Sequence, residues 1–187
     1  MASTSQAQPS FDCAAATHAA EKAICASADL SAMDRELARL YDLARAGPNM
    51  TADRADSLRA TQRDWIKGRN ACWTTQDPQK CARDAYALRI DDLRRSYSEA
   101  RAQPGLSTGP FAYSCTGIDA LISATYVQAG DPVVVLRWRD RTEILPIARS
   151  ASGARYQDGQ TVFWTKGPEG TFTYDGTDHS CQQEDTG

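Results

Sequence analysis

The hydrophobic pattern of this 187-residue chain changes near residue 100, and that change limits the possible folds more than any other feature. Between residues 13 and 100, apolar residues such as Leu30, Leu37 and Leu40 recur on one helical stripe, as in amphipathic helices. Beyond residue 110, short runs rich in β-branched and aromatic residues are separated by turn residues, which is typical of strands. The sequence therefore predicts an all-α part followed by an all-β part.

The boundary between the two patterns is a segment rich in proline and glycine. Residues 101–110 contain two Pro and two Gly in ten positions, the composition of a linker. We therefore expect a helical domain at 11–100, a linker at 101–110 and a β domain at 111–187.

The helical part is expected to hold four helices. Thr17 is suited to cap a short first helix, Ser31 with Asp34 resembles the capping box of a second, and Thr51 is suited to cap a third. A fourth helix carries Tyr86 on its apolar face. Short connections make consecutive helices antiparallel neighbours.

The β part is expected to form a small barrel or sandwich, because short strands follow one another at regular spacing within about 75 residues. The runs that read as strands are Phe111–Cys115, Ala120–Val127, Val133–Trp138, Thr142–Ile147, Thr161–Lys166 and Thr171–Tyr174.

Six cysteines predict a disulfide framework, hence an oxidising compartment, because their number is even and their spacing wide. The alternative is a reduced cytosolic protein with six free thiols; no C-x-x-C motif offers zinc or redox chemistry in its support. The six positions are Cys13, Cys25, Cys72, Cys81, Cys115 and Cys181.

The pairing of these cysteines follows partly from the domain division. Cys115 and Cys181 lie near the two ends of the β domain, so a bridge between them would join its first and last strands. The other four allow three connectivities. An antiparallel hairpin favours Cys25 with Cys72, which leaves Cys13 with Cys81.

Charge and hydropathy exclude several classes of function. The net charge of -3 excludes a strongly basic nucleic-acid binder. No apolar run approaches the roughly 20 residues that span a bilayer. Residues 1–110 carry 15 Lys/Arg against 14 Asp/Glu, whereas residues 111–187 carry 6 against 10. The acidic β domain therefore favours a basic partner.

The start of the chain shows neither a basic nor an apolar leader region, so no signal peptide is visible. Together with the cysteines, this predicts a processed periplasmic or secreted protein. Membrane attachment is expected only if a removed leader carried a lipid anchor.

Few residues suit catalysis. His18 and His179 are the only histidines, which is too few for a histidine-rich metal site or a base-activated nucleophile. The pair Asp91-Asp92 fits a solvated helix face better than the two carboxylates of a glycosidase. No enzyme activity, metal or cofactor is expected.

One set of ordered motifs in the β half points to a known family. Tyr113-Ser114-Cys115 begins the set, Ser152-Gly153-Ala154-Arg155-Tyr156 follows, and Phe163-Trp164-Thr165-Lys166-Gly167 with a terminal cysteine completes it. Over residues 111–182 this resembles the MliC/PliC inhibitors of c-type lysozyme, whose fold is a small antiparallel β-barrel closed by a disulfide.

The resemblance also implies a site. The inhibitory residues of that family are the serine and the lysine of these motifs, which are Ser152 and Lys166 here. Gly153, Tyr156 and Gly167 match as residues that shape the lysozyme-binding loops. Phe163 and Trp164 are interpreted as barrel packing.

The helical half resembles the LprI-type domain, which is also linked to lysozyme inhibition, over nearly all of residues 11–95. No site residue is carried over from that family, and Trp65 and Trp73 are interpreted as core aromatics. The stretches that carry the resemblance are Phe11-Asp12-Cys13, Glu21-Lys22-Ala23-Ile24-Cys25, Leu37-Ala38-Arg39-Leu40-Tyr41, Gln62-x-x-Trp65, Arg69-x-x-Cys72 and Tyr86-x-x-Arg89-Ile90.

The expected protein is thus an α+β two-domain inhibitor. A disulfide-linked antiparallel helical domain precedes a small antiparallel β-barrel, and Ser152 and Lys166 would plug the cleft of c-type lysozyme against its two catalytic carboxylates. The alternative is a non-catalytic envelope adaptor or peptidoglycan-binding module.

Overall fold

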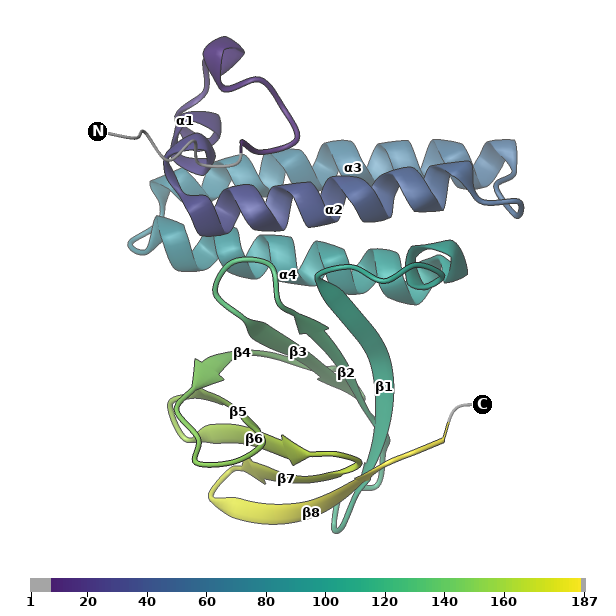
Figure 1. Ribbon diagram of the computed structural model, residues 1–187, viewed down its shortest axis with the longest axis vertical. Coiled ribbons are helices and arrows are strands. Elements are labelled where there is room, and N and C mark those ends of the chain that lie inside the picture. The colour runs from purple at the N-terminus through teal and green to yellow at the C-terminus, as the bar shows by residue number, and fades with distance from the viewer. Residues whose placement is uncertain (1–7, 186–187) are drawn as a thin grey trace. The chain divides into compact units, whose positions relative to one another are not determined.

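The computed structural model describes residues 8–185, and the chain divides into two compact units, Met1–Gly105 and Leu106–Gly187. Figure 1 shows helices in the first unit and strands in the second. The expected fold class, helices followed by a small antiparallel β-barrel, is confirmed.

The helical unit consists of four α-helices and three short 3₁₀ turns within the described residues. Consecutive long helices run in opposite directions (Figure 1), and both α2 and α3 pack against α4. None of these helices is long and apolar enough to cross a membrane. In chain order the elements are η1 Cys13–Ala15, α1 Ala19–Ala26, α2 Ala28–Ala46, α3 Ala52–Ala71, η2 Cys72–Thr74, α4 Pro78–Ser96 and η3 Ser98–Arg101.

Two of the expected helix starts are wrong by a few residues. His18, not Thr17, caps α1, and its side chain forms a capping box with Glu21. The second helix begins earlier than expected, because Ser27 accepts the hydrogen bond from the Leu30 N–H. Thr51 caps α3 as expected.

The early start of α2 turns its expected capping residues into buried ones. Asp34 is 5% exposed, and its Oδ2 accepts hydrogen bonds from the Ser10 N–H at 2.7 Å and the Ser10 hydroxyl at 2.5 Å. The Tyr86 hydroxyl donates to Asp34 Oδ1 at 2.8 Å and accepts from Arg69 Nη1 at 3.0 Å. Burial, together with the Asp34 charge, raises the pKa of Tyr86 well above its usual range. This polar network ties residues from three elements to the segment before η1.

Asp91 of α4 is also buried inside the helical unit. Asp91 is 1% exposed, which corrects its interpretation as part of a solvated helix face; Asp92 is exposed.

The disulfides of the helical unit differ from the expected pairing. Cys13 bonds to Cys25, and Cys72 bonds to Cys81. The expected pairing was based on which ends of the long helices lie close together in an antiparallel hairpin. Instead, tight reversals of the chain bring together cysteines that are only 12 and 9 residues apart.

The β unit is a closed barrel in which each strand pairs antiparallel with the next and β8 returns to β1. Two strands, β5 and β8, were not expected. The strands are β1 Ser107–Cys115, β2 Ile122–Val127, β3 Val133–Trp138, β4 Arg141–Ala148, β5 Ala154–Asp158, β6 Thr161–Lys166, β7 Glu169–Tyr174 and β8 Thr177–Gln183.

The barrel interior is filled by aromatic and aliphatic side chains. Phe163 packs edge-to-face on Tyr113, with ring centroids 5.2 Å apart, and contacts Phe172 on the next strand. Cys115 and Cys181 lie opposite each other on β1 and β8 and form the expected disulfide. This bond joins the first and last strands, where the barrel closes.

The segment expected to be a linker is partly structured. Its last four residues, 107–110, belong to β1, where Ser107 pairs with Val127. Its first residue ends η3, so only residues 102–106 lie outside regular structure.

Candidate functional site

The lysine of the candidate site lies at the end of a tight hairpin. Lys166, the last residue of β6, pairs with Glu169, the first residue of β7, across the two-residue turn Gly167-Pro168. Gly167 has a positive φ of 61°, and the proline ring holds the next φ near -65°, which is the combination of a type II′ turn. Lys166 is exposed, and no ion pair of its ammonium occurs among residues 8–185.

The serine of the candidate site lies in the loop between β4 and β5. Gly153, which follows it, has a φ of 67°, and a β-carbon there would lie 2.3 Å from the Thr165 carbonyl oxygen and 3.2 Å from Lys166 Cβ. Only glycine allows so close an approach. The loop therefore closes onto the end of β6 and brings Ser152 beside the Lys166 hairpin.

Trp164 holds this loop in place. Its indole N–H donates a hydrogen bond of 2.9 Å to the carbonyl oxygen of Ser152, which also accepts from the Ser150 hydroxyl at 2.5 Å. The interpretation of Trp164 as barrel packing is therefore wrong, whereas Phe163 is fully buried inside the barrel. Strand alternation was the signal that could have separated them, because neighbouring residues on a strand point to opposite faces.

Tyr156 lies apart from the exposed residues of the site. It is 2% exposed in the barrel interior, and its hydroxyl accepts a hydrogen bond from Gln128 Nε2 at 3.2 Å. Burial raises the pKa of this hydroxyl. Tyr156 thus supports β5 from inside and presents no surface to a partner. The structure brings Ser152, Gly153, Lys166 and Gly167 together on the outside.

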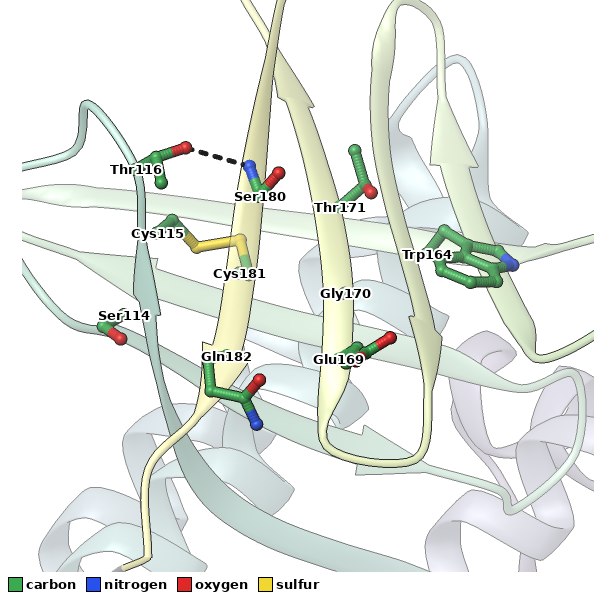
Figure 2. Close-up of a pocket in the computed structure, with 10 residues that line it drawn as sticks. All are labelled: Ser114, Cys115, Thr116, Trp164, Glu169, Gly170, Thr171, Ser180, Cys181 and Gln182. Carbon is green, nitrogen blue, oxygen red and sulfur yellow. Dashed lines mark hydrogen bonds between the residues drawn. A yellow bond between two sulfur atoms is a disulfide. The ribbon is translucent and has the colours of Figure 1, made fainter.

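A shallow cavity of about 660 Å³ lies on the outer surface of the barrel beside the hairpin. Figure 2 shows Trp164 and Glu169 together with polar side chains of β1 and β8, among them Ser114 and Gln182. Neither Ser152 nor Lys166 lines this cavity. Ser152 and Lys166 are therefore exposed side chains that lie outside this cavity.

The described residues offer little else of catalytic or metal-binding character. No group of three or more His, Cys, Asp or Glu side chains suited to a metal ion occurs within residues 8–185. All six cysteines are in disulfides, so none of them presents a thiol.

Two protein families match separate parts of the chain. Residues 13–88 match LprI, described as "Lysozyme inhibitor LprI", and residues 113–180 match MliC, described as "Membrane-bound lysozyme-inhibitor of c-type lysozyme". The chain is an LprI-type domain followed by an MliC-type domain. The order of families expected from the motifs is thereby confirmed.

Similar proteins span both domains or one of them. Lipoprotein LprI of Mycobacterium tuberculosis and that of Mycobacterium bovis are each 29% identical over 175 residues, covering 92% of this chain and 83% of theirs. A crystal structure of Pseudomonas aeruginosa MliC in complex with hen egg white lysozyme is 31% identical, covering 44% of this chain and 91% of that one, with a TM-score of 0.36. The LprI proteins thus match across both the LprI-type and the MliC-type domain.

Proposed function

We propose that this protein inhibits c-type lysozyme by inserting Ser152 and Lys166 of the MliC-type domain into the catalytic cleft. The observation that carries the proposal is that these two exposed residues lie on segments that the backbone brings into close approach. Gly153 and the Trp164 indole hold the Ser152 loop against strand β6, which ends at Lys166. The match of residues 113–180 to a family described as inhibiting c-type lysozyme supports it.

Lys166 would act on the acid that the enzyme needs. A retaining glycosidase uses two carboxyls about 5–5.5 Å apart, one a proton donor and one ionised. In lysozyme a hydrophobic pocket raises the pKa of the donor to about 6. An ammonium beside this group favours its carboxylate form and thus removes the proton that catalysis requires. The lysine stem also occupies the position of the sugar.

Ser152 would bind the second carboxylate. Its hydroxyl makes no hydrogen bond to another of the described residues, so it is available to donate to a partner. Hydrogen bonds to charged groups contribute about 1.5–3 kcal/mol. Hydrogen bonds to the Ser152 carbonyl oxygen already hold this loop, so the loop loses little conformational entropy when it binds lysozyme.

Inhibition of this kind requires no turnover, and we propose that the protein is not an enzyme. We also propose that it works in the cell envelope. The names of its relatives, Lipoprotein LprI and membrane-bound inhibitor, support that location.

The first test is Lys166→Met, which keeps the side-chain stem and removes the charge. Leaving a buried carboxylate unpaired costs about 2–5 kcal/mol, so we expect the inhibition constant against hen egg white lysozyme to rise roughly 30-fold or more. Ser152→Ala should raise it roughly tenfold or more. Clearing of a bacterial cell-wall suspension measures the inhibition.

Lys67→Met is the matched control. Lys67 is a lysine of the helical unit whose side chain is 78% exposed, and its partner Asp64 forms only a surface ion pair. This variant should inhibit like the parent. If Lys166→Met and Ser152→Ala also inhibited like the parent, the proposed site would be wrong.

A further inference from the structure

The helical unit carries a groove of about 420 Å³ that the proposed inhibitory site does not use. The segment before η1, α1, α2 and α3 all contribute to its lining. Its apolar and aromatic lining includes Tyr41 of α2 and Trp65 and Ile66 of α3. Ile66 is 38% exposed and is one of the large hydrophobic side chains that the fold leaves open to solvent.

The polar side chains of the groove are mostly acidic. Glu21, Asp34 and Asp42 are three carboxylates, and Arg69 is the single cation among the lining residues. Asp34 and Arg69 compensate each other, since Arg69 Nη1 lies 3.8 Å from Asp34 Oδ1 and both side chains are 6% exposed. Two carboxylates, those of Glu21 and Asp42, are therefore left to give the groove its negative potential.

The Arg69 guanidinium is held too firmly to turn outward. It donates two hydrogen bonds to Asn70 Oδ1, at 3.2 and 2.9 Å, and lies 5.3 Å from the centre of the Trp65 ring. The Trp65 indole is itself fixed by a 2.9 Å hydrogen bond to the Ala85 carbonyl oxygen. The floor of the groove is thus rigid, and its cation is already bonded.

Glu21 and Asp42 remain able to bind a further cation. Glu21 Oε2 accepts from the backbone N–H groups of Thr17 and His18, both at 3.2 Å, and these bonds lower the pKa of this carboxyl. Within residues 8–185, Asp42 forms an ion pair only with Arg45, at 3.4 Å, and both side chains are about two-thirds exposed, so this pair is weak.

A groove lined by carboxylates as well as aromatic and aliphatic side chains suits one chemical group. A lysine or arginine side chain can lay its methylene stem on Ile66 or Tyr41 while its charged end reaches one of the two carboxylates. An anion or a purely apolar segment would leave Glu21 and Asp42 desolvated without a partner.

We propose that this groove of the LprI-type domain binds a lysine or arginine side chain on the surface of c-type lysozyme. The identity of the partner rests on the proposed function; the cationic chemistry rests on the groove. Because c-type lysozymes are basic proteins, the charges are complementary. The helical unit then adds a second contact with lysozyme, one that does not depend on the inhibitory pair of the barrel.

The experiment uses the full chain carrying Ser152→Ala and Lys166→Met, and measures its binding to hen egg white lysozyme by calorimetry at low ionic strength. We expect residual binding, because the groove is intact. Adding Asp42→Lys should weaken that residual binding at least tenfold. Ile66→Lys, which places a positive charge on the α3 side of the groove, should do the same.

Asp56→Lys is the matched control for Asp42→Lys. Asp56, too, is an exposed acid paired with an arginine three residues later, but it does not line the groove. It should change the residual binding less than twofold. Because both substitutions alter the net charge equally, a difference between them isolates the groove.

Other outcomes would overturn the inference. If the Ser152/Lys166 double variant shows no residual binding, or if Asp42→Lys and Asp56→Lys act alike, the groove is not a lysozyme contact. Loss of retention on insoluble peptidoglycan by Asp42→Lys with unchanged lysozyme binding would assign the groove to a saccharide instead. Failure of the inhibitory site shows separately, as a double variant that still inhibits like the parent.

Discussion

The barrel and the helical unit build their candidate surfaces in opposite ways. In the barrel, backbone hydrogen bonds, a glycine and a tight turn hold two side chains outward, and the exposed charge is positive. In the helical unit, buried polar side chains contribute to a groove whose remaining charged side chains, Glu21 and Asp42, are negative. The Ser152/Lys166 surface of the barrel thus depends on backbone geometry, whereas the groove of the helical unit depends on a few side-chain contacts.

The largest expected effect tests whether the groove depends on its buried network. Asp34→Ala leaves the Arg69 guanidinium buried without a counter-charge and removes the acceptor of both Ser10 and Tyr86. Breaking a buried pair from one side costs about 3–5 kcal/mol, so we expect the free energy of unfolding of the helical unit to fall by that amount. Urea denaturation followed by helical circular dichroism measures it.

Asp34→Asn is the companion variant, because its amide keeps one acceptor oxygen, replaces the other with an NH2 donor and removes the charge. It should also destabilise the unit. A loss below about 1 kcal/mol for Asp34→Ala would contradict the view that side-chain contacts hold the groove together.

The next effect compares the two kinds of disulfide. The bond between Cys115 and Cys181 spans 66 residues, whereas that between Cys72 and Cys81 spans 9. Chain entropy predicts a loss of about 4 kcal/mol for replacing the barrel pair with serine and about 3 kcal/mol for the helical pair. Chemical denaturation of the two double variants, each followed by a signal from its own unit, gives the values. A larger loss of stability for the helical pair than for the barrel pair would contradict this prediction.

The smallest effect tests the backbone support of the inhibitory loop. Trp164→Phe removes the indole hydrogen bond to Ser152 but keeps an aromatic ring on the same strand face. One hydrogen bond contributes about 1 kcal/mol, so inhibition of lysozyme should weaken roughly fivefold while the barrel remains folded. The lysozyme clearing assay measures the change, and Trp73→Phe in the helical unit serves as control. Unchanged inhibition would mean that the glycine and the turn suffice to hold the loop.

Much of the fold could be predicted because hydrophobic period is a local property. The helical stripe of Leu30, Leu37 and Leu40 and the apolar β-like run of β3 both led to the right element type. The missed strands have no such pattern. Residues 177–183 of β8 are mostly polar, and only their pairing with β7 and β1 makes them a strand.

The site could be predicted less completely than the fold. The motifs placed Ser152 and Lys166, and the structure brings their loops together through Gly153. The motifs did not show that Tyr156 lies inside the barrel or that Trp164 supports the loop from outside. Both assignments depend on which strand face a residue occupies, and β5 was not among the strands expected from the sequence.

By itself, the sequence determined the division into a helical and a β part, the oxidised cysteines and the family motifs, because period, composition and spacing are local features. Only the tertiary structure decided which cysteines form disulfides and which buried polar side chains contact one another. The turns paired Cys13 with Cys25 and Cys72 with Cys81, and helix packing buried Asp34 against Tyr86 and Arg69. Such contacts join residues far apart along the chain or depend on the direction of a turn, and their free energy exists only once the elements are packed.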